Sequence, residues 1–164
     1  MGTQRAGVKP CLSAGFTLVE VVLALVIAAA LTVLGVALFT SVMNHVYDDR
    51  AVADIYLIEG LIAHYEVESG HLPASITETS AAGMLDPWGR PYRYINLADA
   101  PKTPSGKPKI HHRMDKFLNP LNTDYDLYSS GKDGQSRMPL TAAASRDDIV
   151  RAANGAYVGL GQDY

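Results

Sequence analysis

The feature that most constrains this chain is a long apolar run that begins near its N-terminus. From Phe16 to Tyr47 the sequence carries one formal charge, Glu20, among Leu, Val, Ala, Ile and Phe residues. A helix needs about 20 mostly apolar residues to cross a bilayer core, and in hydrocarbon only a helix satisfies its own backbone hydrogen bonds. Residues 16–39 are long enough, so we predict a membrane-spanning helix there.

The carboxylate of Glu20 is out of place in such a helix. On insertion scales a mid-helix Asp or Lys costs about 2.5–3.5 kcal/mol, and the few ionisable residues found inside membranes are usually paired or functional. We therefore expect that Glu20 needs a partner, and that nothing else in the run can supply one.

The residues at 15–20, Gly-Phe-Thr-Leu-Val-Glu, stand directly against this run. The hexapeptide resembles the processing site of type IV pilins and of type II secretion pseudopilins. The resemblance implies that a prepilin peptidase cleaves after Gly15 and that the new terminal residue, Phe16, is N-methylated. It also implies that Glu20 neutralises the terminal amine of a neighbouring subunit during assembly. The alternative is an uncleaved signal anchor with an interfacial glutamate.

These observations divide the chain into three parts: a leader over 1–15, an apolar transmembrane and assembly helix over 16–43, and a globular region over 44–164. Arg5 and Lys9 precede the run, and basic residues keep their end of a span in the cytoplasm. The C-terminal region is therefore expected outside the inner membrane. The resemblance adds a later periplasmic or extracellular filament, made with an inner-membrane assembly platform and minor pseudopilins as partners.

Charge and cysteine content limit the other functions open to the chain. Its net charge of −3 becomes about −5 without the leader, which argues against a nucleic-acid-binding surface, so DNA is an unlikely partner. The single cysteine, Cys11, lies in the leader, so a mature protein would have no disulfide to hold together a domain of about 100 residues.

The helix is expected to continue beyond the membrane as an amphipathic segment, to a stop at Ser69-Gly70. That makes one helix of about 50 residues, near 75 Å at 1.5 Å per residue. Apolar residues recur at spacings of three and four, and the acidic residues lie mostly away from that stripe. The stripe consists of Ala51, Ile55, Ile58, Ile62 and Tyr65, and the acids are Asp48, Asp49, Asp54, Glu59 and Glu66.

Short strands are predicted after the helix, around 92–95 and over 124–130. The first follows Asp-Pro-Trp-Gly-Arg-Pro-Tyr at 86–92, which looks like the sheet entrance of the major pseudopilin of type II secretion. The predicted fold is therefore α+β: one long N-terminal transmembrane and amphipathic helix packed on an antiparallel sheet of three or four strands, the lollipop of pilins.

Three aspartates are the best candidates for chemistry. Calcium takes six to eight oxygen ligands and accepts both carboxylates and backbone carbonyls. A glycine-flanked turn bearing Asp133 could present such carbonyls, and the adjacent Asp147 and Asp148 could close the cage from a second loop. Taken alone this pattern is weak, because acidic turns and paired aspartates usually face water, and the spacing is not that of an EF-hand.

The segments 127–134 and 147–149 also resemble the C-terminal calcium loop of major pseudopilins. The resemblance implies a Ca²⁺ cofactor with a structural role. Its ligands would be the side chains of Asp133, Asp147 and Asp148 and the carbonyls of Ser130 and Gln135.

The sequence gives no case for an enzyme. Ser129 and Ser130 lack a nucleophile elbow, and no glycine-rich phosphate loop follows a strand. The most specific expectation is a subunit of a type II secretion pseudopilus. A pilin of a surface filament for adhesion, motility or DNA uptake is the alternative, mildly favoured by the basic loop at 102–116. A membrane-anchored binding module that never polymerises is the remote alternative.

Overall fold

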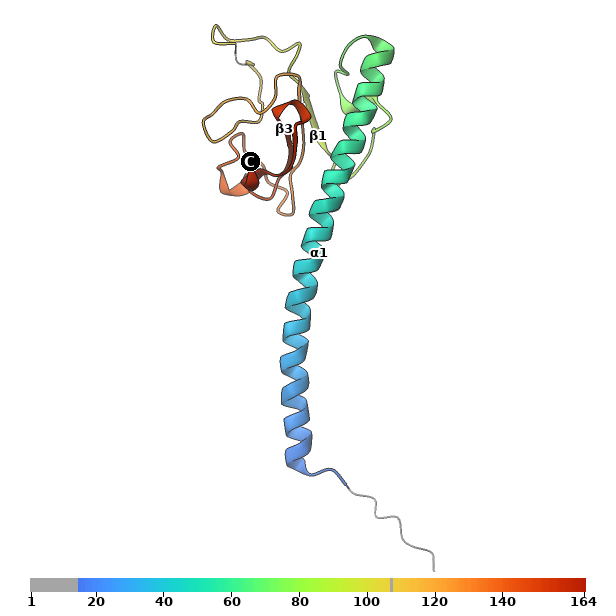
Figure 1. Ribbon diagram of the computed structural model, residues 1–164, viewed down its shortest axis with the longest axis vertical. Helices are drawn as coiled ribbons and strands as arrows, with labels where there is room; N and C mark the ends of the chain where they lie inside the picture. The colour runs from blue at the N-terminus through green and yellow to red at the C-terminus, as the bar shows by residue number, and fades with distance from the viewer. Residues whose placement is uncertain (1–14, 107) are drawn as a thin grey trace, which may run out of the picture. The chain divides into compact units, whose positions relative to one another are not determined.

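The computed structural model describes residues 15–106 and 108–164 (Figure 1). Residue contacts divide the chain into two units, up to Ser41 and from Val42 onward, and each is described by itself. The described elements are α1 (Leu18–Ser69), η1 (Ile76–Glu78), β1 (Arg93–Asn96), β2 (Tyr125–Ser129), η2 (Ala143–Ser145), β3 (Ile149–Ala152), η3 (Ala153–Gly155), β4 (Tyr157–Leu160) and η4 (Gly161–Asp163), the η elements being 3-10 helices.

The first unit is the apolar half of α1. Every side chain from Leu18 to Ser41 is exposed. The helix is long and apolar enough to cross a membrane, as the sequence predicted.

The helix α1 ends where the sequence placed its stop. Gly70 follows it with a φ of 79°, a left-handed conformation that glycine adopts without a steric penalty. Its N–H donates to the carbonyl of Glu66 at 2.8 Å, which closes the last turn. The prediction of one helix reaching Ser69 is confirmed.

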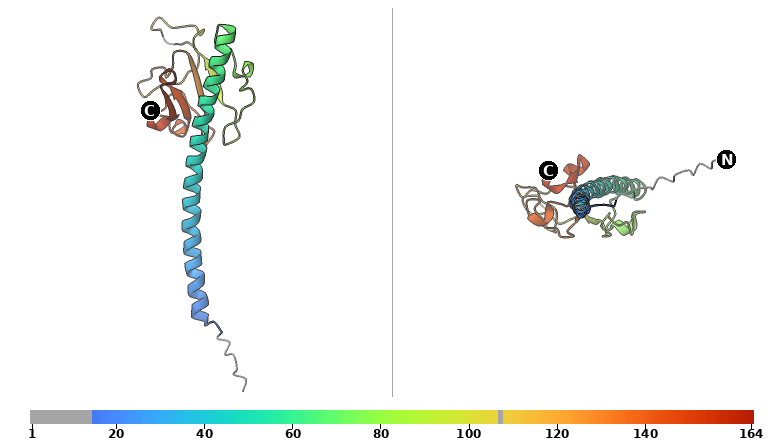
Figure 2. Two further views of the ribbon diagram at one scale, coloured as in Figure 1. Left: turned by 45° about the vertical axis from the view of Figure 1, so that its right-hand side comes forward. Right: turned by 90° about the horizontal axis from the view of Figure 1, so that it is seen from below.

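The second unit contains a four-stranded antiparallel sheet with the strand order β1-β2-β3-β4. Leu127 of β2 pairs with Tyr94 of β1, and Ser129 of β2 pairs with Ile149 of β3. The α+β fold class is confirmed, with four strands. The left view of Figure 2 shows the strands beside the C-terminal half of α1.

One face of the sheet packs against α1. Successive residues of a strand project to opposite faces, so alternate residues of each strand meet the helix. Full burial of an Ile or Leu side chain contributes about 1.5–3 kcal/mol. This core contains Ala51, Ile55, Ile58 and Ile62 of α1 together with Tyr92, Tyr125, Leu127 and Ile149. Four of the five residues of the predicted stripe are thus buried, and Tyr65 is half-buried.

Loops cover the other face of the sheet. The segments that follow β1 and β2, yellow to orange in Figure 1, lie on the side of the strands away from α1. A second, smaller apolar cluster forms there from Leu121, Leu140, Val150 and Ala152. These loops position Arg113, Ser136 and Asp148, the residues that matter most below.

Three or four strands were predicted but only two were given ranges, so the positions of β3 and β4 come from the structure. β3 and β4 form a hairpin in which Val150 pairs with Gly159. The reversal spans residues 153–156 and has positive φ at Ala153 (51°), Asn154 (55°) and Gly155 (91°), a conformation that glycine and asparagine adopt more readily than other residues. The Asn154 side chain also accepts from the Thr123 N–H at 2.8 Å, which ties the hairpin to the segment that precedes β2.

Candidate functional site

The start of α1 is the first candidate site. Gly15, Phe16 and Thr17 precede the helix in non-helical conformation, and Phe16 is 86% exposed. The peptide bond between Gly15 and Phe16 is therefore outside the helical hydrogen-bond ladder.

Glu20 has a hydrogen-bonding partner in its own chain. Its Oε2 accepts from the backbone N–H and from the hydroxyl of Thr17, both at 2.9 Å, and its own N–H donates to the Thr17 hydroxyl at 3.2 Å. This is a capping box, in which the residue before a helix and its third residue satisfy each other's groups. The expectation that nothing in the run could partner Glu20 was wrong for hydrogen bonds. Thr17 is uncharged, so these hydrogen bonds do not neutralise the negative charge of Glu20.

The second candidate site is the predicted calcium loop. The structure brings Asp133 and Asp147 together: the Asp133 N–H donates to Asp147 Oδ2 at 2.9 Å. Gly131 makes this approach possible, because a Cβ at that position would lie 2.1 Å from the Asp147 carbonyl oxygen. The Asp133 carboxylate is itself used locally, since its Oδ1 accepts from the Gln135 N–H at 2.7 Å.

Asp148 is not part of that arrangement. It is fully buried, and its Oδ2 accepts from Arg113 Nη2 at 2.5 Å and from the Ser136 hydroxyl at 2.7 Å. Burial raises the pKa of Asp148 to about 6, although the charge of Arg113 and the hydrogen bond from Ser136 both act to lower that pKa.

As placed, the predicted ligands do not form one set. Asp133 and Asp147 meet on one side, whereas Asp148 faces Arg113, and within residues 15–106 and 108–164 no three His, Cys, Asp or Glu side chains group as metal ligands. Ser130 is buried and Gln135 is exposed. The donors therefore do not fit the cage that the resemblance implies, and calcium binding stays a prediction.

Sequence reasoning missed that one turn recurs along the chain. Segments that begin at Asp86, Thr103 and Asp115 each have a proline five positions later, and in each a bridge joins the residue before the segment to that proline (Leu85–Pro91, Lys102–Pro108 and Met114–Pro120). The fourth residue has positive φ in each: Gly89 (83°), Gly106 (79°) and Leu118 (61°). The spacing Asp/Thr-x-x-x-x-Pro was the available signal.

The first of these turns is hydrogen-bonded to the 127–134 segment, and both segments resemble the major pseudopilin in sequence. Asp86 is buried; its Oδ1 accepts from the N–H groups of Trp88 and Arg90, and its Oδ2 accepts from the Ser129 hydroxyl at 2.6 Å. The Arg90 guanidinium donates to the carbonyl of Gly131 at 2.7 Å. The 86–92 turn and the 127–134 segment are thus one hydrogen-bonded unit.

Comparisons with known protein families, with curated proteins and with solved structures found no match. The long apolar N-terminal helix packed on a small antiparallel sheet is compatible with a pilin-like fold.

Proposed function

We propose that this chain is a structural subunit that is cleaved after Gly15, N-methylated at Phe16 and polymerised into a type II secretion pseudopilus. One observation carries the proposal. A single helix combines an exposed apolar half, which begins three residues after Gly15 and holds one carboxylate in its first turn, with a second half that packs on a sheet. Among the described residues the side chains of the apolar half are exposed, so lipid before assembly and neighbouring helices after it are the natural surroundings.

Orientation follows from the same helix. Arg5 and Lys9 favour a cytoplasmic N-terminus, with the sheet domain outside the inner membrane. After cleavage the amine of Phe16 would be a cation at the membrane end of the helix. Pairing of that amine with Glu20 of an adjacent subunit would fix the axial register of a helical homopolymer. The prepilin peptidase, an assembly platform and minor pseudopilins are the proposed partners.

Two measurements test the proposal. The intact mass of the protein purified from its native membrane should correspond to loss of residues 1–15 plus one methyl group. Electron microscopy of the overproduced protein should then show filaments. An unprocessed mass would contradict the proposal and favour the membrane-anchored binding module.

A surface filament for adhesion, motility or DNA uptake is the second candidate. It is favoured by the exposed lysines of the basic loop, Lys102, Lys109 and Lys116. Secretion by a strain lacking the gene separates the two: loss of secreted substrate with normal adhesion and DNA uptake supports the pseudopilus.

A further inference from the structure

The Asp148 carboxylate presents an electrostatic problem that the fold has to solve. It is fully buried, and the neighbouring Asp147 adds a second negative charge. An isolated buried carboxylate is strongly unfavourable unless a cation compensates it. In the calcium loop that this region resembles, the compensating cation is the metal.

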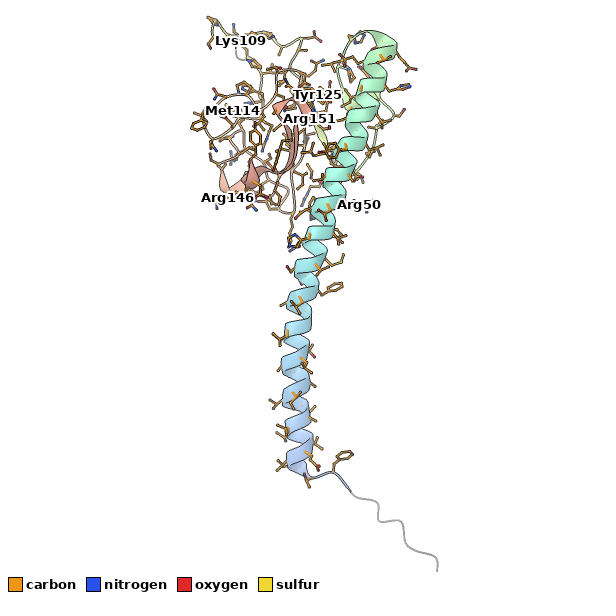
Figure 3. The ribbon with its side chains drawn as sticks, viewed as in Figure 1. Arg50, Lys109, Met114, Tyr125, Arg146 and Arg151 are labelled. Atoms are coloured by element: carbon orange, nitrogen blue, oxygen red, sulfur yellow. The ribbon has the colours of Figure 1, made fainter. Side chains whose placement is uncertain are left out.

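Here the cation beside Asp148 is Arg113. The side chain is 4% exposed, and its Nη2 lies 2.5 Å from Asp148 Oδ2. The same guanidinium donates through Nη1 to the Ser136 hydroxyl and to the Arg137 carbonyl, and it stacks over the Tyr128 ring at 4.7 Å. Figure 3 shows Met114, the residue after Arg113, on the loops that lie beyond the sheet from α1.

These contacts join three segments that are far apart in the sequence. Arg113 belongs to the long connection between β1 and β2, Ser136 and Arg137 follow the Gly131–Gly134 turn, and Asp148 directly precedes β3. A bound ion in the predicted cage would likewise tie the turn to the start of β3. The backbone N–H of Arg113 is held in turn by Asp126 Oδ2 at 2.5 Å.

We propose that the Arg113 guanidinium takes the role that the family resemblance assigns to calcium: it neutralises Asp148, ties the 131–137 turn to β3, and makes folding of the sheet domain independent of divalent ions. A guanidinium suits this task because its planar donors can serve several acceptors at once. Its positive charge also disfavours a divalent cation at the same carboxylate. The inference goes beyond the proposed function, because it concerns the folding of the subunit and not its assembly.

Two buried polar atoms of this cluster, Asp148 Oδ1 and Arg113 Nε, make no hydrogen bond within the described residues. Asp148 Oδ1 is therefore the carboxylate oxygen still open to a metal. Substitution of Asp148 is for this reason included in the test.

The test is thermal melting of the full chain in detergent micelles, followed by the fluorescence of Trp88, the chain's one tryptophan. Trp88 reports on the sheet domain because its ring packs edge-on against Tyr47 and its turn is bonded to β2. The wild-type midpoint should be the same within about 1 °C in calcium and in excess EGTA. Arg113→Met should lower the midpoint by about 10 °C or more in both, as expected for an uncompensated buried charge.

Arg137→Met is the matched control, because Arg137 is an exposed arginine on the neighbouring β2–β3 connection and should change the midpoint little. If Arg113→Met does not fold, the double variant Arg113→Met/Asp148→Leu removes both charges. Its midpoint should be higher than that of the single variant Asp148→Leu, in which Arg113 stays buried without its partner. A wild-type midpoint that rises with calcium, with the rise lost in Asp148→Asn, would overturn the proposal. So would equal midpoints for Arg113→Met and Arg137→Met. Neither readout depends on processing or polymerisation.

Discussion

Arg151 of β3 donates from Nε to Glu59 of α1 at 2.5 Å, and this bond is a polar connection between the helix and the sheet beside their apolar core. The same guanidinium donates from Nη2 to Asp124 Oδ2 at 2.7 Å and lies 3.9 Å from the centre of the Tyr125 ring, beside which it is labelled in Figure 3. Only 5% of its side chain is exposed. One buried cation therefore compensates two carboxylates.

Replacing Arg151 by Met should lower the free energy of unfolding by about 3–5 kcal/mol, because Glu59 and Asp124 would keep their charges without a partner. Urea denaturation of the detergent-solubilised protein measures this change. Arg50→Met is the control. Arg50 lies on α1, 4.0 Å from Asp54, and 66% of its side chain is exposed. An exposed pair of this kind contributes at most about 1 kcal/mol. Similar losses for the two variants would refute the role given to Arg151.

The repeated turn supplies a comparison of one motif in two environments. Asp86→Ala should destabilise by about 2–3 kcal/mol, because the Ser129 hydroxyl and two backbone N–H groups would lose a buried acceptor. Asp115 makes the same pair of bonds, to the N–H groups of Phe117 and Asn119 at 2.8 Å, in an exposed turn where water can replace it. Asp115→Ala should therefore cost less than about 1 kcal/mol. Both values come from denaturant midpoints, and an equal cost would show that the contact with Ser129 contributes nothing.

Asp126 should make stability depend on pH in a direction opposite to that of an ordinary salt-bridged aspartate. Burial raises the pKa of Asp126 above its usual value, although the Arg113 N–H, the Asn122 amide and the nearby His112 and Arg113 charges act to lower that pKa. The folded state then binds a proton more tightly than the unfolded chain, so stability falls as pH rises from the unfolded pKa, about 3.9, through the raised folded value. Asp126→Asn should lack this component.

The measurement is the difference in unfolding free energy between wild type and Asp126→Asn across the acid range, because the slope of that difference isolates the one carboxyl group. A constant offset is expected from the altered bond with Asn122, whose amide donates to Asp126 at 2.9 Å. A difference that does not vary with pH, or that grows in favour of wild type as pH rises, would contradict the prediction.

The periodicity of the sequence was sufficient to predict α1, its buried stripe and its end, since these depend on local spacing and on Gly70. The β3–β4 hairpin was missed although Asn154-Gly155 is a strong hairpin signal. The four residues of β3 include the charged Arg151 and so do not form an apolar run. Arg151 can be buried because it pairs with Glu59 and Asp124, which lie far away in the sequence. Long-range charge pairing of this kind leaves no local pattern.

The same limit applies to the candidate calcium loop. Asp147 and Asp148 directly precede β3, and neighbouring residues at a strand point to opposite faces, so the two carboxylates could have been expected to separate. Period-two reasoning could therefore have predicted the split between Asp147 and Asp148. It could not have identified Arg113 as the partner of Asp148, because that pairing spans 35 residues and depends on how the covering loops pack.

The capping box at the start of α1 allows the two roles of Glu20 to be separated by experiment. Glu20→Ala removes both the cap to Thr17 and the negative charge, whereas Glu20→Gln keeps a side-chain oxygen that can accept from the Thr17 N–H. If pairing with the amine of an adjacent Phe16 drives assembly, both variants should be processed normally and neither should form filaments. The reason is that the amine would then be buried without a counter-charge, at a cost of several kcal/mol. Mass spectrometry checks processing, and electron microscopy with sedimentation checks assembly. Filaments formed by Glu20→Gln but not by Glu20→Ala would show instead that Glu20 acts through the helix cap.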